Sequence, residues 1–363
     1  MKAMILAAGG GTRLYPLTFT LPKPVVPIMN RPTMEHIIRH IKEHGFTNIM
    51  VNLHNLPEHI ENYFKDGSEI GVNINYSHEN EPLGTAGGVK YVEDFFDDTF
   101  MVIGGDDLHD INLSELVNFH KEKKALATIG LSYEKDVHQY GVVVVNEEGR
   151  IIEFQEKPSN EEAKSHWVNN GIYIFEPEIL RHIPAGTFYD FGSQLFPRLK
   201  EQGAPFYGFK CKGYWKDIGN LVEYRNAHFD CLKGKVKVHF PGYELKKGVW
   251  LEEGVVMADD VEITPPVLIG KNCKLARGAK ITGPVVMGKY NVLDEGVEIK
   301  HTVLWNFNHL KKDVKLLDCL MGSECIVEEG RVFERTVLGS GMKSIFEDYF
   351  RHPKMEDTGR LKI

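Results

Sequence analysis

The sequence predicts two domains of different architecture, an α/β domain over residues 1–235 and a parallel β-helix over residues 236–345, followed by a tail over residues 346–363. Two periodicities carry this prediction. Short apolar runs alternate with amphipathic stretches in the first part, whereas a large apolar residue recurs at every sixth position in the second part. A chain of 363 residues is also longer than one typical hydrophobic core supports.

The first part alternates between expected strands and expected helices. We expect strands at residues 2–7, 48–53, 72–76, 100–103 and 127–131, and helices at residues 33–45, 57–65, 85–95, 113–123 and 221–232. Residues 140–154 and 167–175 are richer in strand-forming residues. Strands that alternate with helices predict a parallel α/β sheet, in which ligands bind at the carboxyl ends of the strands.

The second part repeats with a period of six residues. Alternating strands would give a period of two, so we interpret the pattern as hexapeptide repeats of a parallel β-helix, with the large apolar residues inside the prism. Residues 321–326 and 327–332 resemble further repeats, and a short helix from about residue 343 to 349 is expected to cap the end. The periodic residues are Leu251, Met257, Ile263, Ile269, Leu275, Ile281, Met287, Leu293, Ile299 and Trp305.

Composition excludes several classes of protein. The formal net charge of −8 argues against a broad basic face for nucleic acid. The five cysteines are scattered without a CxxC pair, which favours reduced thiols in a cytoplasm over a disulfide framework or a zinc site. Eighteen consecutive apolar residues occur nowhere, and the apolar start of the chain is too short for a signal-peptide core. We therefore expect a cytoplasmic protein without nucleic-acid or membrane partners.

A glycine-rich loop follows the first expected strand and carries the main chemical signal. It contains the run Gly9-Gly10-Gly11-Thr12-Arg13 and leads to Pro22-Lys23-Pro24. The run lacks the Lys-Ser or Lys-Thr pair of a Walker loop and the third glycine of a dinucleotide-binding fingerprint. A tight turn between a strand and a helix would also need glycine, so the glycines alone leave a structural role open.

The two cations of this segment extend the signal beyond the glycines. Backbone N–H groups beside glycine can approach anionic oxygens closely, and the guanidinium group of Arg13 can fork across two phosphate oxygens. Lys23 supplies a point charge, and the prolines on both sides restrict its backbone.

The whole string GxGTRLxPLTxxxPKP resembles the signature of the nucleotidyltransferase family that makes NDP-sugars from a nucleoside triphosphate (NTP) and a sugar 1-phosphate. Further motifs similar to those of the family occur in the same order across residues 1–235, and the hexapeptide repeats match a two-domain branch of it. The resemblance implies a Rossmann-like mixed sheet for the first domain and a left-handed parallel β-helix for the second.

The resemblance also implies roles for individual residues. Residues 79–88 resemble the base-recognition segment, residues 102–107 and 214–219 the two metal-binding elements, and residues 154–158 the element that contacts the sugar phosphate. The implied catalytic residues are Arg13, Lys23, Asp106, Lys157 and Asp217, of which Asp106 and Asp217 hold Mg²⁺. The implied nucleotide-binding residues are Ala8, Gly9, Gly11, Thr12, Glu79, Gly84 and Thr85, and the implied sugar-binding residues are Gly141, Glu156 and Asn170.

The expected reaction is an in-line attack of the sugar 1-phosphate on the α-phosphorus of the NTP, which expels pyrophosphate. The attacking phosphate is already anionic, so catalysis requires positioning and charge neutralisation rather than a general base. Guanine presents two adjacent donors that suit the carboxylate of Glu79 or Glu81, which favours GTP. The two-domain layout resembles that of mannose-1-phosphate guanylyltransferases, which implies mannose 1-phosphate as the sugar substrate. Other segments resemble a cyanobacterial type of uridylyltransferase, so UTP and glucose 1-phosphate are the alternative.

Two further classes stay open. An acyltransferase could act through the β-helix with His301 or His309 as its base, although His309 falls on a small inward position of the repeat. A regulator that only binds sugar nucleotides would not need Arg13, Lys23 or the aspartates, all of which are present. The β-helix is expected to mediate homo-oligomerisation, because the sides and open end of a solenoid allow copies to stack.

Overall fold

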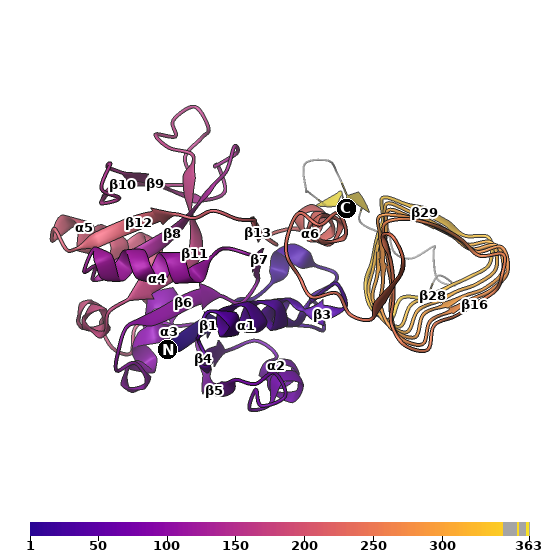
Figure 1. Cartoon of the computed structure of the whole chain (residues 1–363), viewed down its shortest axis with the longest axis horizontal. Coiled ribbons are helices and arrows are strands. Elements are labelled where there is room, and N and C mark those ends of the chain that lie inside the picture. The colour runs from indigo at the N-terminus through magenta and orange to yellow at the C-terminus, as the bar shows by residue number, and fades with distance from the viewer. Residues whose placement is uncertain (344–353, 356–360, 363) are drawn as a thin grey trace. The chain divides into compact units, whose positions relative to one another are not determined.

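The computed structural model describes residues 1–343 and the two short strands β31 (Lys354–Met355) and β32 (Leu361–Lys362) (Figure 1). Its contacts divide the chain into two compact units. Unit 1 contains Met1–Gly10 and Ile37–Trp215, and unit 2 contains Gly11–His36 and the chain from Lys216 onward. The segment with Arg13 and Lys23 therefore groups with the β-helix rather than with the sheet.

Unit 1 is built on a mixed nine-stranded sheet, which confirms the Rossmann-like α/β prediction. Its main order is β10-β9-β11-β6-β1-β4-β5, and β8 joins β11 to β12. Neighbours β6, β1, β4 and β5 are parallel, whereas β11 is antiparallel to β6 and β8. The strands are β1 (Lys2–Leu6), β4 (Asn48–Leu53), β5 (Asn73–His78), β6 (Phe100–Gly104), β8 (Ala127–Tyr133), β9 (Gly141–Val145), β10 (Ile151–Glu156), β11 (Trp167–Phe175) and β12 (Phe206–Lys210).

Helices accompany this sheet as the alternating pattern predicts. They are α2 (Pro57–Phe64), α3 (Gly84–Tyr91), α4 (Leu113–Glu122) and α5 (Phe196–Glu201), and α1 (Thr33–Glu43) starts in unit 2 and continues in unit 1. The Asn112 side chain caps α4 by accepting a hydrogen bond from the backbone N–H of Glu115. A buried cluster of apolar residues from β6, β8, β11, α3 and α5 forms the core of the unit.

The carboxyl ends of β1 and β6 lie side by side because the two strands are paired in parallel. The glycine-rich loop leaves β1 at this edge, and Gly104-Gly105-Asp106 leaves β6 beside it. The backbone N–H of Gly105 donates to the carbonyl of Leu6 at 2.9 Å. The sheet thus brings two predicted site segments to one edge of unit 1.

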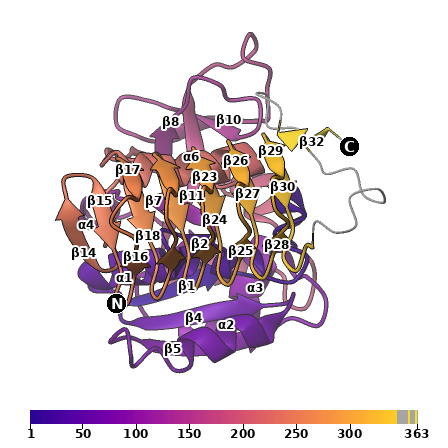
Figure 2. The ribbon, with the colours of Figure 1, turned by 90° about the vertical axis from the view of Figure 1, so that its right-hand side faces the viewer.

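Unit 2 contains the predicted left-handed β-helix, whose three parallel sheets form the sides of a triangular prism (Figure 1). Figure 2 shows the successive coils stacked beside one another. The strands of the three sheets run from β15 (Val249–Leu251) to β30 (Val337–Leu338), β16 (Val256–Met257) to β28 (Ile326–Val327), and β17 (Glu262–Thr264) to β29 (Val332–Glu334). The antiparallel strand β14 (Tyr243–Lys246) precedes the first coil, and α6 (Leu221–Leu232) precedes the prism.

The coils shorten by one residue between Lys300 and Val303, so the sequence prediction is wrong at the next periodic position, Trp305. Leu251, Ile269 and Met287 stack at intervals of 18 residues, but the next partner of Met287 is Leu304, only 17 residues further on. Later coils keep the shorter repeat, as Leu304 pairs with Met321. Leu304 belongs to the interior cluster and Trp305 does not. The same shift removes His309 from the predicted small inward position, which Asn308 occupies instead.

Buried asparagines replace apolar residues at the same position of two successive coils of this prism. Asn291 and Asn308 are almost fully buried. The Nδ2 group of Asn291 donates to the carbonyls of Gly288 and Trp305, each at 2.8 Å, and its Oδ1 accepts from the N–H of Asn308 at 2.9 Å. In turn, the Oδ1 of Asn308 accepts from the N–H of Cys325. The ladder satisfies backbone groups that the interior would otherwise leave unpaired.

Other sequence predictions fall partly outside the described residues. The expected capping helix over residues 343–349 and most of the predicted tail lie there. The boundary predicted at residue 235 stays a prediction, and the compact units group residues 11–36 and 216–235 with the β-helix coils. In the described part of the chain, every helix is too short or too polar to cross a membrane.

We predict that Asn291→Ala destabilises the fold. The substitution leaves the carbonyls of Gly288 and Trp305 without this donor and the N–H of Asn308 without its acceptor. Each buried group left unpaired costs about 1–3 kcal/mol, so urea unfolding should show a loss of at least about 2 kcal/mol. Lys274→Ala, at an exposed position on the same β-helix, is the control and should change stability little. Equal stability of Asn291→Ala and wild type would contradict the structural role of the ladder.

Candidate functional site

The glycine-rich loop approaches Lys23 within unit 2. Gly11 has a φ of 64° and precedes the short helix η1 (Thr12–Leu14), and its carbonyl accepts a hydrogen bond from the Thr18 hydroxyl at 2.8 Å. A Cβ atom at Gly11 would lie 3.2 Å from the Cβ of Lys23. Both the backbone conformation and this close approach require glycine here.

Lys23 is a buried cation. It begins the short helix η2 (Lys23–Val25), and the residue is only 8% exposed. Its Nζ lies 3.7 Å from Oδ1 of Asp217, which ends the strand β13 (Trp215–Asp217). A buried ammonium group is costly without a nearby negative charge, so Asp217 compensates for its burial.

Arg13 joins this pair beside Gly219. A Cβ atom at Gly219 would lie 2.8 Å from Oδ2 of Asp217 and 3.0 Å from NH1 of Arg13, so both side chains lie over this glycine. Unit 2 therefore gathers two permanent cations and one carboxylate, all three of them predicted site residues. An excess of positive charge at one place suits a polyanionic ligand such as a triphosphate.

The start of the loop lies in unit 1 and has a different character. Ala8, Gly9 and Gly10 follow β1, and a Cβ atom added at Gly9 or Gly10 would meet no atom within 4 Å. Neither residue has a positive φ. Unlike Gly11, these two positions therefore require glycine neither for packing nor for turn geometry. A ligand that approaches the backbone closely would explain the absence of a side chain there.

Asp106 lies at the neighbouring strand end in unit 1. It follows β6, and its Oδ1 lies 3.3 Å from the position of a Cβ on Gly104. Gly105 contacts β1 so closely that its Cβ would lie 2.9 Å from the carbonyl oxygen of Leu6. These glycines let the β6 loop lie against β1 and place the Asp106 carboxylate at the carboxyl edge of the sheet.

Glu79, in the segment predicted to recognise the base, hydrogen-bonds inside unit 1. Its side chain is buried, where Oε1 accepts from Nδ2 of Asn52 at 2.7 Å and Oε2 accepts from the N–H of Leu83 at 2.9 Å. The Oδ1 of Asn52 accepts from the N–H of Ala7 at 2.8 Å. Glu79 thus ties β1, β4 and the start of α3 together, while Glu81 is exposed.

Gly84 and Thr85 also make contacts inside unit 1. Gly84 has a φ of 76°, and a Cβ there would lie 2.6 Å from the carbonyl oxygen of Tyr189. The Thr85 hydroxyl donates to Oδ2 of Asp190 and accepts from the N–H of Phe191, each at 2.8 Å. The nucleotide-binding roles of these residues and of Thr12 stay predictions, carried by their place at the start of α3 and η1.

The predicted sugar-contact residues separate into two kinds. Gly141 and Glu156 are paired across the hairpin of β9 and β10, and the exposed Lys157 follows with its Nζ 3.8 Å from Oε1 of Glu156. Asn170 is buried instead, where its Nδ2 donates to the Ser132 hydroxyl and its Oδ1 accepts from the N–H of Ile172. The side chains of Glu156 and Lys157 are therefore available to a ligand, and that of Asn170 braces β8 against β11.

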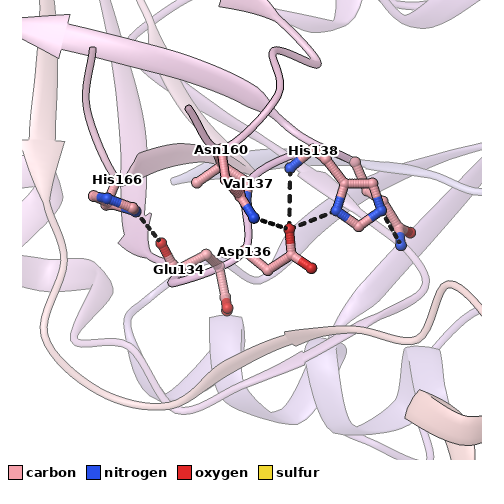
Figure 3. A network of polar contacts seen from close by, with 7 residues as sticks. Glu134, Asp136, Val137, His138, Asn160 and His166 are labelled. Carbon is pink, nitrogen blue, oxygen red and sulfur yellow. Dashed lines mark hydrogen bonds and ion pairs between the residues drawn. The ribbon is translucent and has the colours of Figure 1, made fainter. Parts of the chain in front are cut away.

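A polar network joins the two loops beside this hairpin (Figure 3). Oδ1 of Asp136 accepts from Nδ2 of Asn160 at 3.0 Å and lies 2.5 Å from Nδ1 of His138, while Oδ1 of Asn160 accepts from the N–H of Val137. The hydrogen bond from His138, followed by that from Asn160, lowers the pKa of the Asp136 carboxyl. The backbone N–H of Lys157 also donates to the carbonyl of Tyr140, and the carbonyl of His166 accepts from the N–H of Glu134, so the loop that begins at Lys157 is held at both ends.

Asp106 and Asp217 suit Mg²⁺ by their chemistry. Mg²⁺ usually takes one or two carboxylates and completes its shell with water and substrate phosphate oxygens. Over the described residues no group of three or more His, Cys, Asp or Glu side chains could hold a metal alone. Asp106 belongs to unit 1 and Asp217 to unit 2, so binding of Mg²⁺ by both stays a prediction.

Sequence reasoning missed Asn52 and Gly219. Asn52 interrupts the apolar run of β4 and is buried, and a polar residue near the end of a buried strand is a signal that could have found it. Gly219 follows Asp217 within a recognised motif, but only the structure shows that Arg13 occupies the space beside it.

Comparisons with known proteins agree with this arrangement. The family described as nucleotidyl transferase matches residues 2–234. A UTP–glucose-1-phosphate uridylyltransferase from Synechocystis sp. is 42% identical over 351 residues, which cover 92% of this chain and 90% of that protein. A mannose-1-phosphate guanylyltransferase from Mycobacterium tuberculosis is 32% identical over 73% of this chain and 77% of its own length.

Among solved structures, one from Bacillus anthracis designated a glucose-1-phosphate thymidylyltransferase, in complex with a sucrose, is similar in fold. It has a TM-score of 0.59 and 26% sequence identity, and the match covers 66% of this chain and 97% of that chain.

We predict that Gly219→Ala impairs activity without unfolding the protein. The new Cβ displaces the ends of two flexible side chains, Asp217 and Arg13, rather than backbone atoms. Misplacement of a catalytic group by about 1 Å costs on the order of 100-fold in rate, so pyrophosphate release should fall by about 10- to 100-fold. Gly192→Ala is the control, because its Cβ would make only an ordinary contact at 3.5 Å. Wild-type kinetics in Gly219→Ala would contradict a role for these two side chains.

Proposed function

This chain belongs to the nucleotidyl transferase family, and from that premise we propose that it transfers a uridylyl group from UTP to glucose 1-phosphate, with UDP-glucose and pyrophosphate as products. The chain is a sugar-1-phosphate nucleotidyltransferase, and the proposal concerns the base and the sugar. The 42% identical uridylyltransferase supports the proposal because its similarity extends over 92% of this chain, including the β-helix coils.

The position of Glu79 is the observation that supports uracil rather than guanine as the base. A carboxylate selects guanine when its two oxygens accept from the N1–H and the N2 amino group of the base. Both oxygens of Glu79 already accept from Asn52 and Leu83 inside the protein, and the residue is 6% exposed. Glu79 therefore no longer supports GTP, and the argument for guanine depends on Glu81 alone. Uracil presents one donor between two acceptors, which suits an amide or backbone pair.

Charge neutralisation by unit 2 supports the reaction type. An oxygen of glucose 1-phosphate attacks the α-phosphorus of UTP, the bond from that phosphorus to the β-phosphate bridging oxygen breaks, and pyrophosphate leaves. Arg13 would stabilise the departing β- and γ-phosphates and Lys23 the α-phosphate, while Lys157 would anchor the attacking phosphate. Asp106 and Asp217 are the residues that would hold Mg²⁺, whose charge would further neutralise the phosphates.

Mannose-1-phosphate guanylyltransferase activity is the second candidate. Proteins of that name from Mycobacterium tuberculosis and Danio rerio are each 32% identical to this chain, and the second match covers 93% of it. Glu81 is exposed and belongs to the base-recognition segment, so one carboxylate remains there that could accept from guanine. Assembly into a homo-oligomer through the β-helix also stays a proposal.

A matrix of substrates tests the choice between these candidates. The purified protein would be incubated with each of UTP, GTP, dTTP and ATP and with glucose 1-phosphate or mannose 1-phosphate, in the presence of Mg²⁺, and pyrophosphate release would be followed. We expect UTP with glucose 1-phosphate to give the highest kcat/KM, by at least about tenfold. A higher kcat/KM for GTP with mannose 1-phosphate would establish the second candidate. If no pair of substrates releases pyrophosphate, the result would favour a binding protein.

We predict that Lys23→Ala and Asp106→Ala each lower kcat by about 10²–10³, because removal of one preorganised charged group from such a site has that effect. Lys274→Ala, at an exposed position of the β-helix, is the matched control and should keep wild-type kinetics. Circular dichroism would verify that the variants remain folded. Near-normal turnover by either folded variant would overturn the roles proposed for these two residues.

A further inference from the structure

The segment that follows Lys23 makes a tight hairpin with an unfavourable backbone. Strands β2 (Pro27–Ile28) and β3 (Arg31–Pro32) are antiparallel, and the two residues between them, Met29 and Asn30, have φ values of 49° and 63°. Positive φ at both central positions is the geometry of a type I′ turn, which methionine rarely adopts. Contacts from elsewhere in unit 2 must therefore stabilise this turn.

Helix α6 supplies two of these contacts from residues one turn apart. The hydroxyl of Tyr224 donates to the carbonyl of Pro27 at 2.7 Å, and Nδ1 of His228 accepts from the N–H of Met29 at 3.3 Å. The two rings pack edge to face with their centroids 4.9 Å apart. Pro27 has no N–H, so the carbonyl that Tyr224 holds is its only polar backbone group.

The β-helix supplies the partner of Tyr224. The indole Nε1–H of Trp305 donates to the Tyr224 hydroxyl at 2.8 Å. An indole N–H can only donate, so the tyrosine oxygen accepts from Trp305 and directs its single proton to Pro27. Complete burial raises the pKa of Tyr224, which keeps that proton in place. The result is a directed chain from Trp305 through Tyr224 to the backbone four residues beyond Lys23.

Hydrogen bonds hold the backbone of Trp305 in place, just after the point where the coils shorten. Its carbonyl accepts from the side chains of Asn291 and Asn308, at 2.8 and 3.1 Å, and its N–H donates to the carbonyl of Met321. The shortening from 18 to 17 residues moves Leu304 into the interior, so Trp305 is not needed there and its indole reaches Tyr224.

Two further contacts join the same segment to the β-helix. Nδ2 of Asn30 donates to Oε1 of Glu252 at 2.9 Å and to the carbonyl of Met287 at 3.0 Å. On the other side of Lys23, a Cβ atom at Gly339 would lie 3.2 Å from the Cβ of Pro16. β-helix coils thus contact this segment both before and after Lys23.

We propose that Trp305 and Tyr224 are positioning residues for Lys23, so that the β-helix sets the rate of nucleotidyl transfer through a hydrogen-bonded chain to the Pro27 carbonyl. The inference rests on the proposed role of Lys23. Loss of the Tyr224 hydroxyl leaves the Pro27 carbonyl without this donor, and loss of the Trp305 indole N–H removes the contact that directs the hydroxyl toward Pro27. Either change lets the Lys23–Val25 turn shift, which misplaces the ammonium group relative to the phosphate it stabilises in the transition state. Substrate binding depends on many other contacts, so the KM values change less than kcat.

Two conservative variants test this proposal. Tyr224→Phe removes the hydroxyl and Trp305→Phe removes the indole donor, and both keep an aromatic ring in place. Each should lower kcat by about tenfold and change the KM of either substrate by less than about threefold. Because Trp305 acts through Tyr224, the double variant should be no slower than Tyr224→Phe, whereas independent structural effects would multiply. Trp250→Phe, whose ring stacks on Phe240 of the same β-helix, is the control.

Amide hydrogen exchange gives a second readout that does not depend on turnover. The N–H groups of Val25 and Val26 donate to the carbonyls of Pro22 and Lys23. Tyr224→Phe should speed exchange of these two amides by at least about tenfold and leave amides of the β-helix interior unchanged. Faster exchange throughout the β-helix would show a general loss of stability and overturn the positioning role.

The outcomes separate this inference from the proposed function. An active wild-type protein whose Tyr224→Phe and Trp305→Phe variants keep wild-type kcat overturns the inference alone, as do multiplicative effects in the double variant. A wild-type protein that releases no pyrophosphate with any substrate pair overturns the proposed function and, with it, the catalytic consequence of the chain.

Discussion

The burial of a positive charge at Lys23 is the constraint on which the rest of unit 2 depends. A lysine that is 8% exposed requires a carboxylate nearby and a backbone that cannot move away from it. Asp217 supplies the charge at 3.7 Å, and Gly11 and Gly219 provide the space in which the loop, Arg13 and Asp217 come together. The prolines on both sides of Lys23 limit its backbone, and α6 and the β-helix hold the hairpin that follows. The same burial that is costly for the free protein keeps a cation ready for a polyanionic ligand, where its charge acts with little screening by water.

The β-helix could be predicted from the sequence because its interior imposes a period that a linear pattern reveals directly. Ile269, Leu275 and Ile281 each occupy one side of the prism, and any polar residue at such a position would be buried. The pattern could not reveal the shorter coils after Met287. Trp305 is large and apolar and stands six residues after Ile299, so it fitted the period although it does not lie in the interior. Asn291 gave a hint, because an amide inside the prism must hydrogen-bond to backbone that the regular repeat leaves unpaired.

The chemistry of the site was predictable to the level of the reaction but not to the level of the base. Glycines, cations and strand-end aspartates follow from what phosphate requires, and their order along the chain is visible in the sequence. The sequence names Glu79 as a carboxylate but does not show that Asn52 and Leu83 occupy its oxygens. Asn170 and Thr85 are similar cases, as their side chains hydrogen-bond within unit 1. Polar side chains near a site serve either the ligand or the scaffold, and only the positions of their partners separate the two roles.

Trp305 shows why a departure from a regular pattern deserves a physical explanation. A regular coil would place a residue of this kind inside the prism, where its indole N–H would lack an acceptor. The deletion of one residue from the coil moves Leu304 inward and leaves the indole beside Tyr224, which accepts its hydrogen bond. Stacking of the coils gains nothing from this change, because the 18-residue coils before Met287 and the 17-residue coils after it both pair in register. The gain appears outside the prism, at the carbonyl of Pro27, and this is the physical reason to connect the β-helix with the backbone that carries Lys23.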